Sequence, residues 1–294
     1  MEKQISIIAL VLIGILACSK KDSTSPDNNN ANPIATSGCL VADVTDSASN
    51  QKEESYTYDA NRRLIKYTYD KKGSYSTFTY GTGTVTVQNF SSSGIASRSP
   101  KTISLNANGY YKGDIYSVPD TPSTPGVRKD TIVLTYTSDN RLLSFKYNYT
   151  TYANNFNSII DQMSRTSNYT YSGNKLTKLV VGVYNGVGGK SNESYTHEYT
   201  YDETSPTVKS ANPVFSEDGS GNGYFYGRIK SDKIPEKKVT TRSSSGSPIP
   251  SVYTTTYTAV VDAKGNPTKV RTVTTYSDGT SPFIRTKYYT YNCP

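Results

Sequence analysis

The sequence contains no tryptophan, one histidine, two methionines and three cysteines among its 294 residues. These counts exclude zinc sites made of four cysteines, or of two cysteines and two histidines. The hydrophobic fraction of 34% is too low for a protein with many membrane-spanning helices. Tyrosine, in contrast, is abundant, with 27 residues. Together with frequent Thr, Ser, Asn and Gly, it favours half-exposed β-sheet over helix.

An apolar run from Ile5 to Ala17 lies close to the N-terminus. It is shorter than the roughly 20 residues of a membrane-spanning helix, so it predicts the core of a signal peptide. The run ends in Leu16-Ala17-Cys18, which resembles a bacterial lipobox. That resemblance implies cleavage into a signal peptide of residues 1–17 and a mature chain that begins with a lipidated (palmitate-type, diacylated) Cys18. A secretory signal with an incidental cysteine is the alternative.

Residues 18–38 form a low-complexity segment with a run of asparagines and no apolar periodicity. Such a segment cannot bury enough apolar surface to fold, so we expect a disordered tether that spans roughly 25 Å. Its Lys20-Lys21-Asp22 cluster is similar to the signal that directs lipoproteins of Bacteroidota to the cell surface. We expect lipid anchoring in the outer membrane, with the periplasmic and the surface-facing orientation both open.

A short unit recurs in residues 39–294, which we expect to form one domain. In three copies a strand that ends in Tyr meets a polar turn, and Leu opens the next strand; two further copies have a turn of similar length between other residues. The copies span Tyr58 to Leu64, Leu105 to Tyr111, Tyr136 to Leu142, Tyr171 to Leu176, and Val261 to Pro267. Their turns are rich in Asn, Asp and Gly, the residues that tolerate the positive φ of tight hairpins.

The strands that follow these turns alternate with a period of two, which indicates β-structure. Hairpins that follow one another without helical crossovers predict an all-β antiparallel meander that forms a twisted, curled open sheet. At most one short helix is expected. Its candidate is the apolar spacing of Tyr152, Phe156, Ile159, Ile160 and Met163, for which a long loop is the alternative.

The segment from Tyr58 to Ile65 resembles the tyrosine-aspartate (YD) repeat of Rhs-type proteins, whose pattern is Tyr-Asp, two residues, then Gly-Arg-Leu. Arg62 stands at the position of the glycine in that pattern. The whole layout is similar to small lipoproteins of Bacteroidota built around a domain of unknown function. The resemblance implies the hairpin fold and gives almost no information on activity.

Cys39 and Cys293 remain once Cys18 carries lipid, and they open and close the folded part of the chain. Export places them in a compartment where disulfides form, and chain termini often lie close together. We therefore predict a disulfide between them. Two free thiols are the alternative.

The abundance of tyrosine has two explanations. The tyrosines are either structural residues of the strands or a binding platform for sugar rings or an extended chain. Such a platform is expected at Tyr67, Tyr69, Tyr147 and Tyr149, which alternate on one side of equivalent strands.

The net charge of +8 comes from basic residues scattered along the chain, so we expect a solvated surface and no nucleic-acid partner. We expect His197 to be a structural residue of a strand and not a catalytic one.

Metal binding has one weak candidate, a calcium loop at Asp218, Ser220 and Asn222, whose twelfth position is Ile229 instead of Glu. No cofactor is expected.

We predict a non-catalytic binding or structural module of the envelope, with a polysaccharide or an envelope protein as partner. The alternative is a carbohydrate-active enzyme, whose pair of carboxylates would be assembled only in space.

Overall fold

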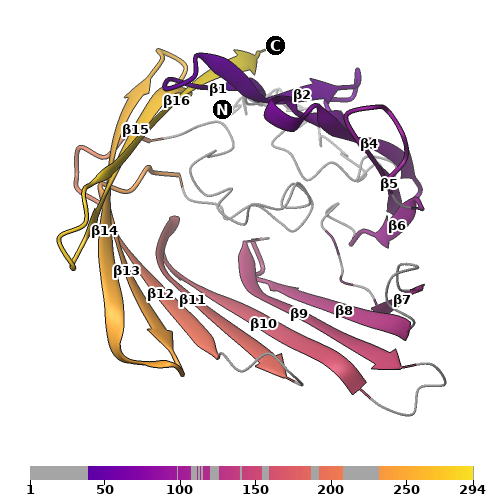
Figure 1. The fold of residues 1–294 in the computed structure, drawn as a ribbon. Coiled ribbons are helices and arrows are strands. Elements are labelled where there is room, and N and C mark those ends of the chain that lie inside the picture. Colours follow the sequence, from indigo (N-terminus) through magenta and orange to yellow (C-terminus); the bar gives the residue numbers. More distant parts are fainter. Residues whose placement is uncertain are drawn as a thin grey trace, which may run out of the picture.

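The computed structural model describes residues 39–97, 99–106, 111, 113, 115–119, 126–139, 141–153, 159–186, 192–207 and 232–293. These residues form one antiparallel sheet of sixteen strands (Figure 1). The strands are β1 (Leu40–Asp46), β2 (Gln51–Tyr58), β3 (Leu64–Tyr69), β4 (Ser74–Gly81), β5 (Thr84–Phe90), β6 (Lys101–Ser104), β7 (Ile115–Pro119), β8 (Gly126–Tyr136), β9 (Leu142–Ala153), β10 (Ile159–Ser172), β11 (Lys175–Gly186), β12 (Glu193–Thr200), β13 (Lys237–Ser244), β14 (Ser247–Val261), β15 (Pro267–Tyr276) and β16 (Phe283–Asn292).

The sheet is a meander in which strands adjacent in sequence are adjacent in space. The first and last strands also pair, with Val44 opposite Tyr289, so both ends of the described chain lie in the middle of the sheet. Its two edges are then β6 and β7, which follow each other in the chain. Figure 1 shows the sheet curled until these edges lie on the same side of the molecule. The prediction of an all-β antiparallel meander in a curled open sheet is confirmed.

The concave side, which we call the inner face, holds two apolar clusters. The first joins side chains from β3 to β6 with side chains from β8 to β12, among them Leu64, Phe78, Leu142 and Leu176. The second lies over β1 and β14 to β16 and contains Val44. The first cluster joins strands that face each other across the curl, so it lies on the concave side. The buried positions of the strands therefore face inward. Alternate positions face outward because the side-chain period of a strand is two.

The repeated turns lie together at one end of the sheet, which we call the repeat rim; the opposite end, with the turns at 47–50, 70–73, 245–246 and 277–282, is the far rim. In all five copies the two predicted end residues are paired directly: Tyr58 with Leu64, Leu105 with Tyr111, Tyr136 with Leu142, Tyr171 with Leu176, and Val261 with Pro267. Four of the units read from the sequence are thus hairpins between neighbouring strands, and Leu105 and Tyr111 form an isolated bridge.

A second regularity links each unit to the one before it. In six places of the described chain, a tyrosine within one residue of the end of a strand donates its hydroxyl hydrogen to a backbone carbonyl in the preceding unit. The pairs are Tyr58 to Val41, Tyr80 to Leu64, Tyr136 to Tyr111, Tyr171 to Leu142, Tyr201 to Leu176, and Tyr291 to Pro267. Tyrosine suits this position because its ring packs on the apolar cluster while its hydroxyl satisfies a carbonyl at the rim.

The basic residue before the buried Leu of the unit makes a further contact between units. The guanidinium carbon of Arg63 lies 4.7 Å from the ring centroid of Tyr80, and that of Arg141 lies 4.8 Å from the ring of Tyr171. Such cation–π contacts contribute roughly 0.5–1 kcal/mol at exposed sites. Residues of the turn thus stabilise the next hairpin along the sheet.

The expected helix around residues 152–163 is wrong in its described part. Ile159 to Met163 belong to β10, where Met163 pairs with Tyr149 of β9. The β-branched isoleucines and the ladder with β9 outweigh the apolar spacing that suggested a helix. The helical element that the structure describes is one 3₁₀ turn, η1 (Asp70–Lys72). None of the described helical residues forms a segment long and apolar enough to cross a bilayer.

Candidate ligand-binding face

The four tyrosines predicted as a platform all lie on the inner face, in two separate pairs. Tyr67 packs against the first apolar cluster and against Tyr56, with ring centroids 5.2 Å apart, and this burial raises the pKa of Tyr67 well above its ordinary value. Tyr147 and Tyr149 have centroids 6.2 Å apart, and the Tyr149 hydroxyl donates to Asp161 at 2.8 Å. Tyr67 and Tyr147 come from strands that are not neighbours in the sheet, and both pack against the first apolar cluster.

A group of four charges lies on the inner face of β1, β2 and β16. Nη2 of Arg285 donates to both carboxylate oxygens of Glu53, at 2.6 and 2.7 Å. Nζ of Lys287 lies 3.3 Å from Glu53, and Nε of Arg285 lies 3.7 Å from Asp46. Glu53 is only 3% exposed, so this pairing compensates the cost of burying its charge. The two positive and two negative charges cancel.

A bulge in β2 brings Glu53 to this position. Val44 of β1 pairs with Glu54 and Thr45 pairs with Lys52, which leaves Glu53 as an extra residue. A bulge re-aims the side chain of the extra residue, and here that residue meets β16 across β1. The alternation of the strand alone would not have placed Glu53 on the same face as Glu54.

A second charged pair lies on β12 and β13. Nη2 of Arg242 donates to Glu193 at 2.8 Å, and the hydroxyl of Tyr195 donates to the other oxygen of the same carboxylate. These two hydrogen bonds, with Tyr195 the stronger influence, hold the pKa of Glu193 below its usual value. The guanidinium of Arg242 also lies over the ring of Tyr195, 5.6 Å from its centroid.

Three aromatic side chains lie between these two charged groups. Tyr253 of β14 pairs with Tyr276 of β15, and their ring centroids are 6.0 Å apart. Phe283 of β16 pairs with Thr274, which places it diagonally beside Tyr276 on the same face. We call Tyr253, Tyr276 and Phe283 the aromatic row. Two of its members are well exposed, Tyr276 by 38% and Phe283 by 58%.

The charged groups border the row at its two ends. Arg242 pairs with Ser251, two residues before Tyr253 on β14. At the other end, Arg285 follows Phe283 by two residues on β16, so both side chains share the inner face. This arrangement could not be predicted from the sequence, because its members come from six strands, β2 and β12 to β16. Their alternation within each strand was visible, but the registers that align them were not.

Other titratable residues have structural roles where the structure describes them. Nδ1 of His197 lies 2.8 Å from the hydroxyl of Thr240 on the neighbouring strand. Asp59 accepts the backbone N–H of Arg63 within its turn. The calcium candidate, Asp218, Ser220 and Asn222, lies outside the described residues, as does Cys18. Among the residues with described positions, no group of three or more His, Cys, Asp or Glu is arranged to hold a metal ion.

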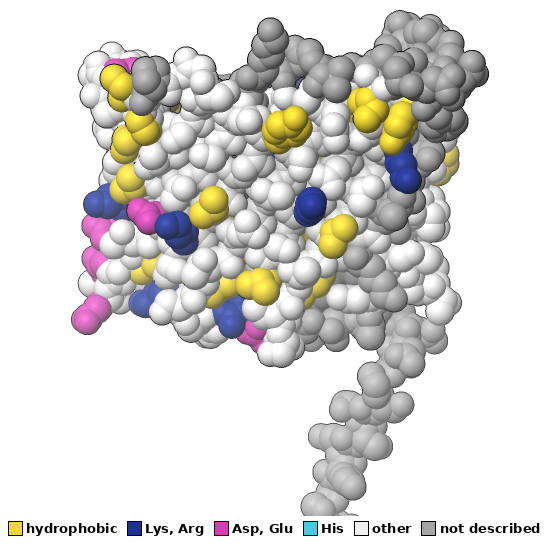
Figure 2. Space-filling view, turned by 90° about the horizontal axis from the view of Figure 1, so that it is seen from below, with side chains coloured by type: hydrophobic (Ala, Val, Ile, Leu, Met, Phe, Trp, Pro, Cys, Tyr) yellow, Lys and Arg dark blue, Asp and Glu magenta, His cyan; other side chains and the backbone are white. Residues whose placement is uncertain are grey.

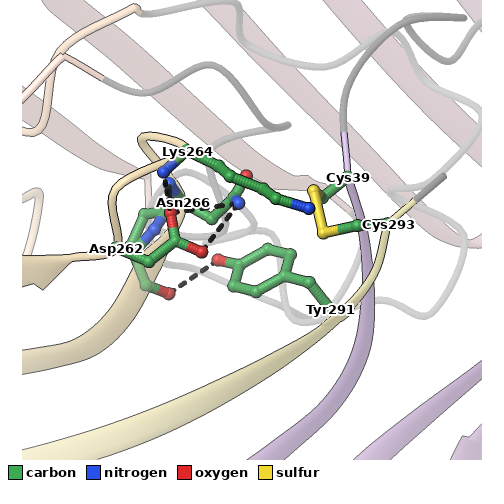
Figure 3. The surroundings of a disulfide bond; sticks show 7 residues. Cys39, Asp262, Lys264, Asn266, Tyr291 and Cys293 are labelled. Carbon is green, nitrogen blue, oxygen red and sulfur yellow. Dashed lines mark hydrogen bonds between the residues drawn. A yellow bond between two sulfur atoms is a disulfide. The ribbon is translucent and has the colours of Figure 1, made fainter.

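The disulfide between Cys39 and Cys293 is present, as predicted, with Cα atoms 4.3 Å apart. Figure 3 shows it at the repeat rim beside Tyr291, whose hydroxyl donates to the carbonyl of Pro267 at 2.7 Å. The turn at Asp262 lies next to it. Both ends of the described chain therefore leave the sheet at the rim opposite to the exposed end of the aromatic row.

The fold is similar to that of two solved structures. A porin-like protein from Bacteroides uniformis ATCC 8492 matches with a TM-score of 0.56 and 14% identity, over 89% of this chain and 100% of that chain. A porin-like protein from Bacteroides vulgatus ATCC 8482 matches with a TM-score of 0.53 and 15% identity, over 86% and 98%. Identities this low establish a shared fold. No protein-family model and no curated protein matches the chain, so the resemblance to YD repeats stays a prediction.

Proposed function

We propose that this chain is an outer-membrane lipoprotein, anchored through Cys18, that holds its porin-like sheet in water as a non-catalytic binding scaffold. The observation that carries the proposal is the chemistry of the outer face. A sheet embedded in a bilayer presents apolar side chains to the lipid, and charged residues there cost about 2–4 kcal/mol each at the midplane. The outer positions of this chain have a different composition.

Hydroxyl, amide and charged side chains dominate the outer face. The outer positions of the central part of β10 are Gln162, Ser164, Thr166, Asn168 and Thr170, those of β12 are Ser194, Thr196, Glu198 and Thr200, and those of the second half of β14 are Thr254, Thr256, Thr258 and Val260. Figure 2, which views the side formed by the lower strands of Figure 1, shows isolated apolar side chains on a mostly polar surface. Apolar residues scattered singly are normal for a surface in contact with water.

Two further observations support the envelope as the location. The lipobox-like end of the apolar run and the polar tether are typical of an exported, anchored protein. The two structures of similar fold are porin-like proteins from Bacteroides, an origin consistent with the lipoprotein-like N-terminus.

The inner face supports binding over catalysis. Glu53 and Glu193, the carboxylates at the ends of the aromatic row, each bind an arginine. A glycosidase needs one carboxyl group that gives a proton and a second that attacks or activates water. Carboxylates fixed by guanidinium groups suit a rigid polar surface instead.

Fractionation of cells tests the anchor. Wild-type protein should enter the detergent phase on Triton X-114 partitioning and sediment with outer membranes, whereas Cys18→Ala should become aqueous or remain an uncleaved precursor, because the acyl chains supply the membrane affinity. A Cys39→Ser, Cys293→Ser double variant serves as control and should stay anchored. A Cys18→Ala protein of mature size that still sediments with the outer membrane would overturn the proposal.

A further inference from the structure

The aromatic row differs from the other tyrosines of the inner face in what it contacts. Tyr171 and Tyr201 pack on the first apolar cluster and hydrogen-bond to carbonyls at the repeat rim. Neither apolar cluster of the described chain includes Tyr253, Tyr276 or Phe283. The exposed side chains of Tyr276 and Phe283 thus lie side by side on the inner face outside both clusters, and a molecule that covers them would remove this apolar surface from water.

The dimensions of the aromatic row suit a chain of linked sugar rings. It crosses three neighbouring strands, which are spaced about 4.8 Å apart, so it extends about 10 Å across the sheet. Tyr253 and Tyr276 are 6.0 Å apart between centroids, with planes inclined by 42°. Aromatic rings at successive steps can each cover the C–H face of one sugar ring, which is the apolar side of a pyranose.

The charges around the row favour an uncharged ligand. Arg242 is paired with Glu193 at one end, and Arg285 and Lys287 are paired with Glu53 and Asp46 at the other. Residues 243–261 contain no charged side chain, and residues 272–284 contain only Asp278. An acidic polymer would find no excess of positive charge here, although the whole chain has a net charge of +8.

The paired side chains at both ends also offer directed hydrogen bonds. An arginine bound to a carboxylate keeps N–H groups that point away from the pair, and the carboxylate keeps lone pairs. Adjacent hydroxyl groups of a sugar match such planar donors and acceptors. A few fixed polar groups beside an apolar surface are typical of small-molecule sites.

We infer that Tyr253, Tyr276 and Phe283, bordered by Arg242–Glu193 and Arg285–Glu53, form a subsite for two or three pyranose residues of an uncharged glycan. The inference rests on the proposed function as a binding scaffold and names its ligand class. The subsite lies toward the far rim, away from the chain ends at the disulfide, so an anchored protein would present it away from the membrane.

Isothermal titration of the full mature protein in detergent tests the inference. The probes are the neutral hexasaccharides of α-1,4-glucan, β-1,4-glucan, β-1,4-mannan and β-1,4-xylan, with polygalacturonate as the anionic probe. At least one neutral probe should bind. A Tyr276→Ser, Phe283→Ser double variant should weaken that binding at least about fivefold, because it removes the two exposed rings that would cover the sugar.

A matched control comes from the other face of the same strand. Ile284 and Tyr288 are 55% and 43% exposed, and an Ile284→Ser, Tyr288→Ser double variant should bind like wild type. Equal melting temperatures of both variants would show that the fold is intact. Wild-type affinity in the Tyr276→Ser, Phe283→Ser protein would overturn the location while leaving a glycan-binding scaffold in place. Binding of polygalacturonate alone, or of no probe, would overturn the inference. The proposed lipid anchor is tested separately by the fractionation of Cys18→Ala.

Discussion

The hydroxyl of Tyr171 donates a hydrogen bond of 3.0 Å to the carbonyl oxygen of Leu142, 29 residues earlier in the chain. Arg141, the neighbour of Leu142, lies over the same tyrosine ring. The same pair of contacts joins Tyr80 to Leu64 and Arg63, and Tyr201 to Leu176 and Lys175. In these three places the repeat therefore links a hairpin to the preceding one by a hydrogen bond and a cation–π contact at the rim, where strand pairing ends.

Replacement of Tyr171 by Phe should lower the free energy of unfolding by about 1–2 kcal/mol, because it leaves the carbonyl of the buried Leu142 without this donor. The ring, and with it the contact to Arg141, is retained. Urea denaturation measures the effect. Tyr184→Phe, at an exposed outer position, is the control and should change nothing; equal effects at both sites would contradict the role of the hydroxyl.

Arg62 has a φ of 63° at the position where the YD pattern has glycine. A left-handed conformation costs a residue with a side chain roughly 1–2 kcal/mol, whereas glycine adopts it freely but loses more entropy on folding. Arg62→Gly should therefore stabilise the protein by about 0.5 kcal/mol in urea denaturation. Arg63→Gly, in the same turn, should destabilise it. Destabilisation by Arg62→Gly would mean that side-chain contacts of Arg62 outweigh the backbone strain.

The Glu53–Arg285 pair should be worth more than an ion pair on the outer face. Glu53→Gln leaves two cations without their buried counter-charge and should cost about 1–3 kcal/mol, reduced from the value of a fully buried pair because Arg285 is partly exposed. Asp43→Asn, which breaks the outer pair with Lys52, should cost less than about 1 kcal/mol. Similar losses in the two variants would contradict the buried character of the inner group.

Acid should weaken the turn at Asp262. Hydrogen bonds from the side chain and backbone of Asn266 hold the pKa of Asp262 below its ordinary value of 3.8. A carboxylate with a lowered folded-state pKa stabilises the protein above its unfolded-state pKa and loses this contribution as the pH falls through the folded value. Melting temperatures from about pH 5 to about pH 2 should fall less steeply in Asp262→Asn than in wild type. Parallel curves would contradict this prediction.

Loss of the disulfide should loosen the junction of β1 and β16. The bond closes a loop with a sequence separation of 254, for which chain entropy allows at most roughly 5 kcal/mol of stabilisation. The Cys39→Ser, Cys293→Ser variant should melt at a lower temperature and exchange amide hydrogens faster in these two strands than in β10 and β11. Uniform exchange across the sheet would argue against a local role.

The sequence by itself determined the local structure of this protein. Tyr58 and Leu64, or Tyr171 and Leu176, are separated by one short turn, so turn chemistry and the period of two are enough to predict that they pair. The disulfide was predictable for a different reason, because only Cys39 and Cys293 remain as partners if Cys18 carries lipid. Both inferences use information that lies within a few residues or in a simple count.

Tertiary structure decided which distant strands meet and what they bring together. The pairing of β1 with β16 is needed before Glu53 can reach Arg285, 232 residues away, and the bulge that turns Glu53 inward has no clear signal in the sequence. The aromatic row likewise depends on registers between β14, β15 and β16, where a slip of one residue would move Phe283 to the other face. Contacts between distant strands follow from the curl of the whole sheet, and that curl is the sum of small twists that no single segment specifies.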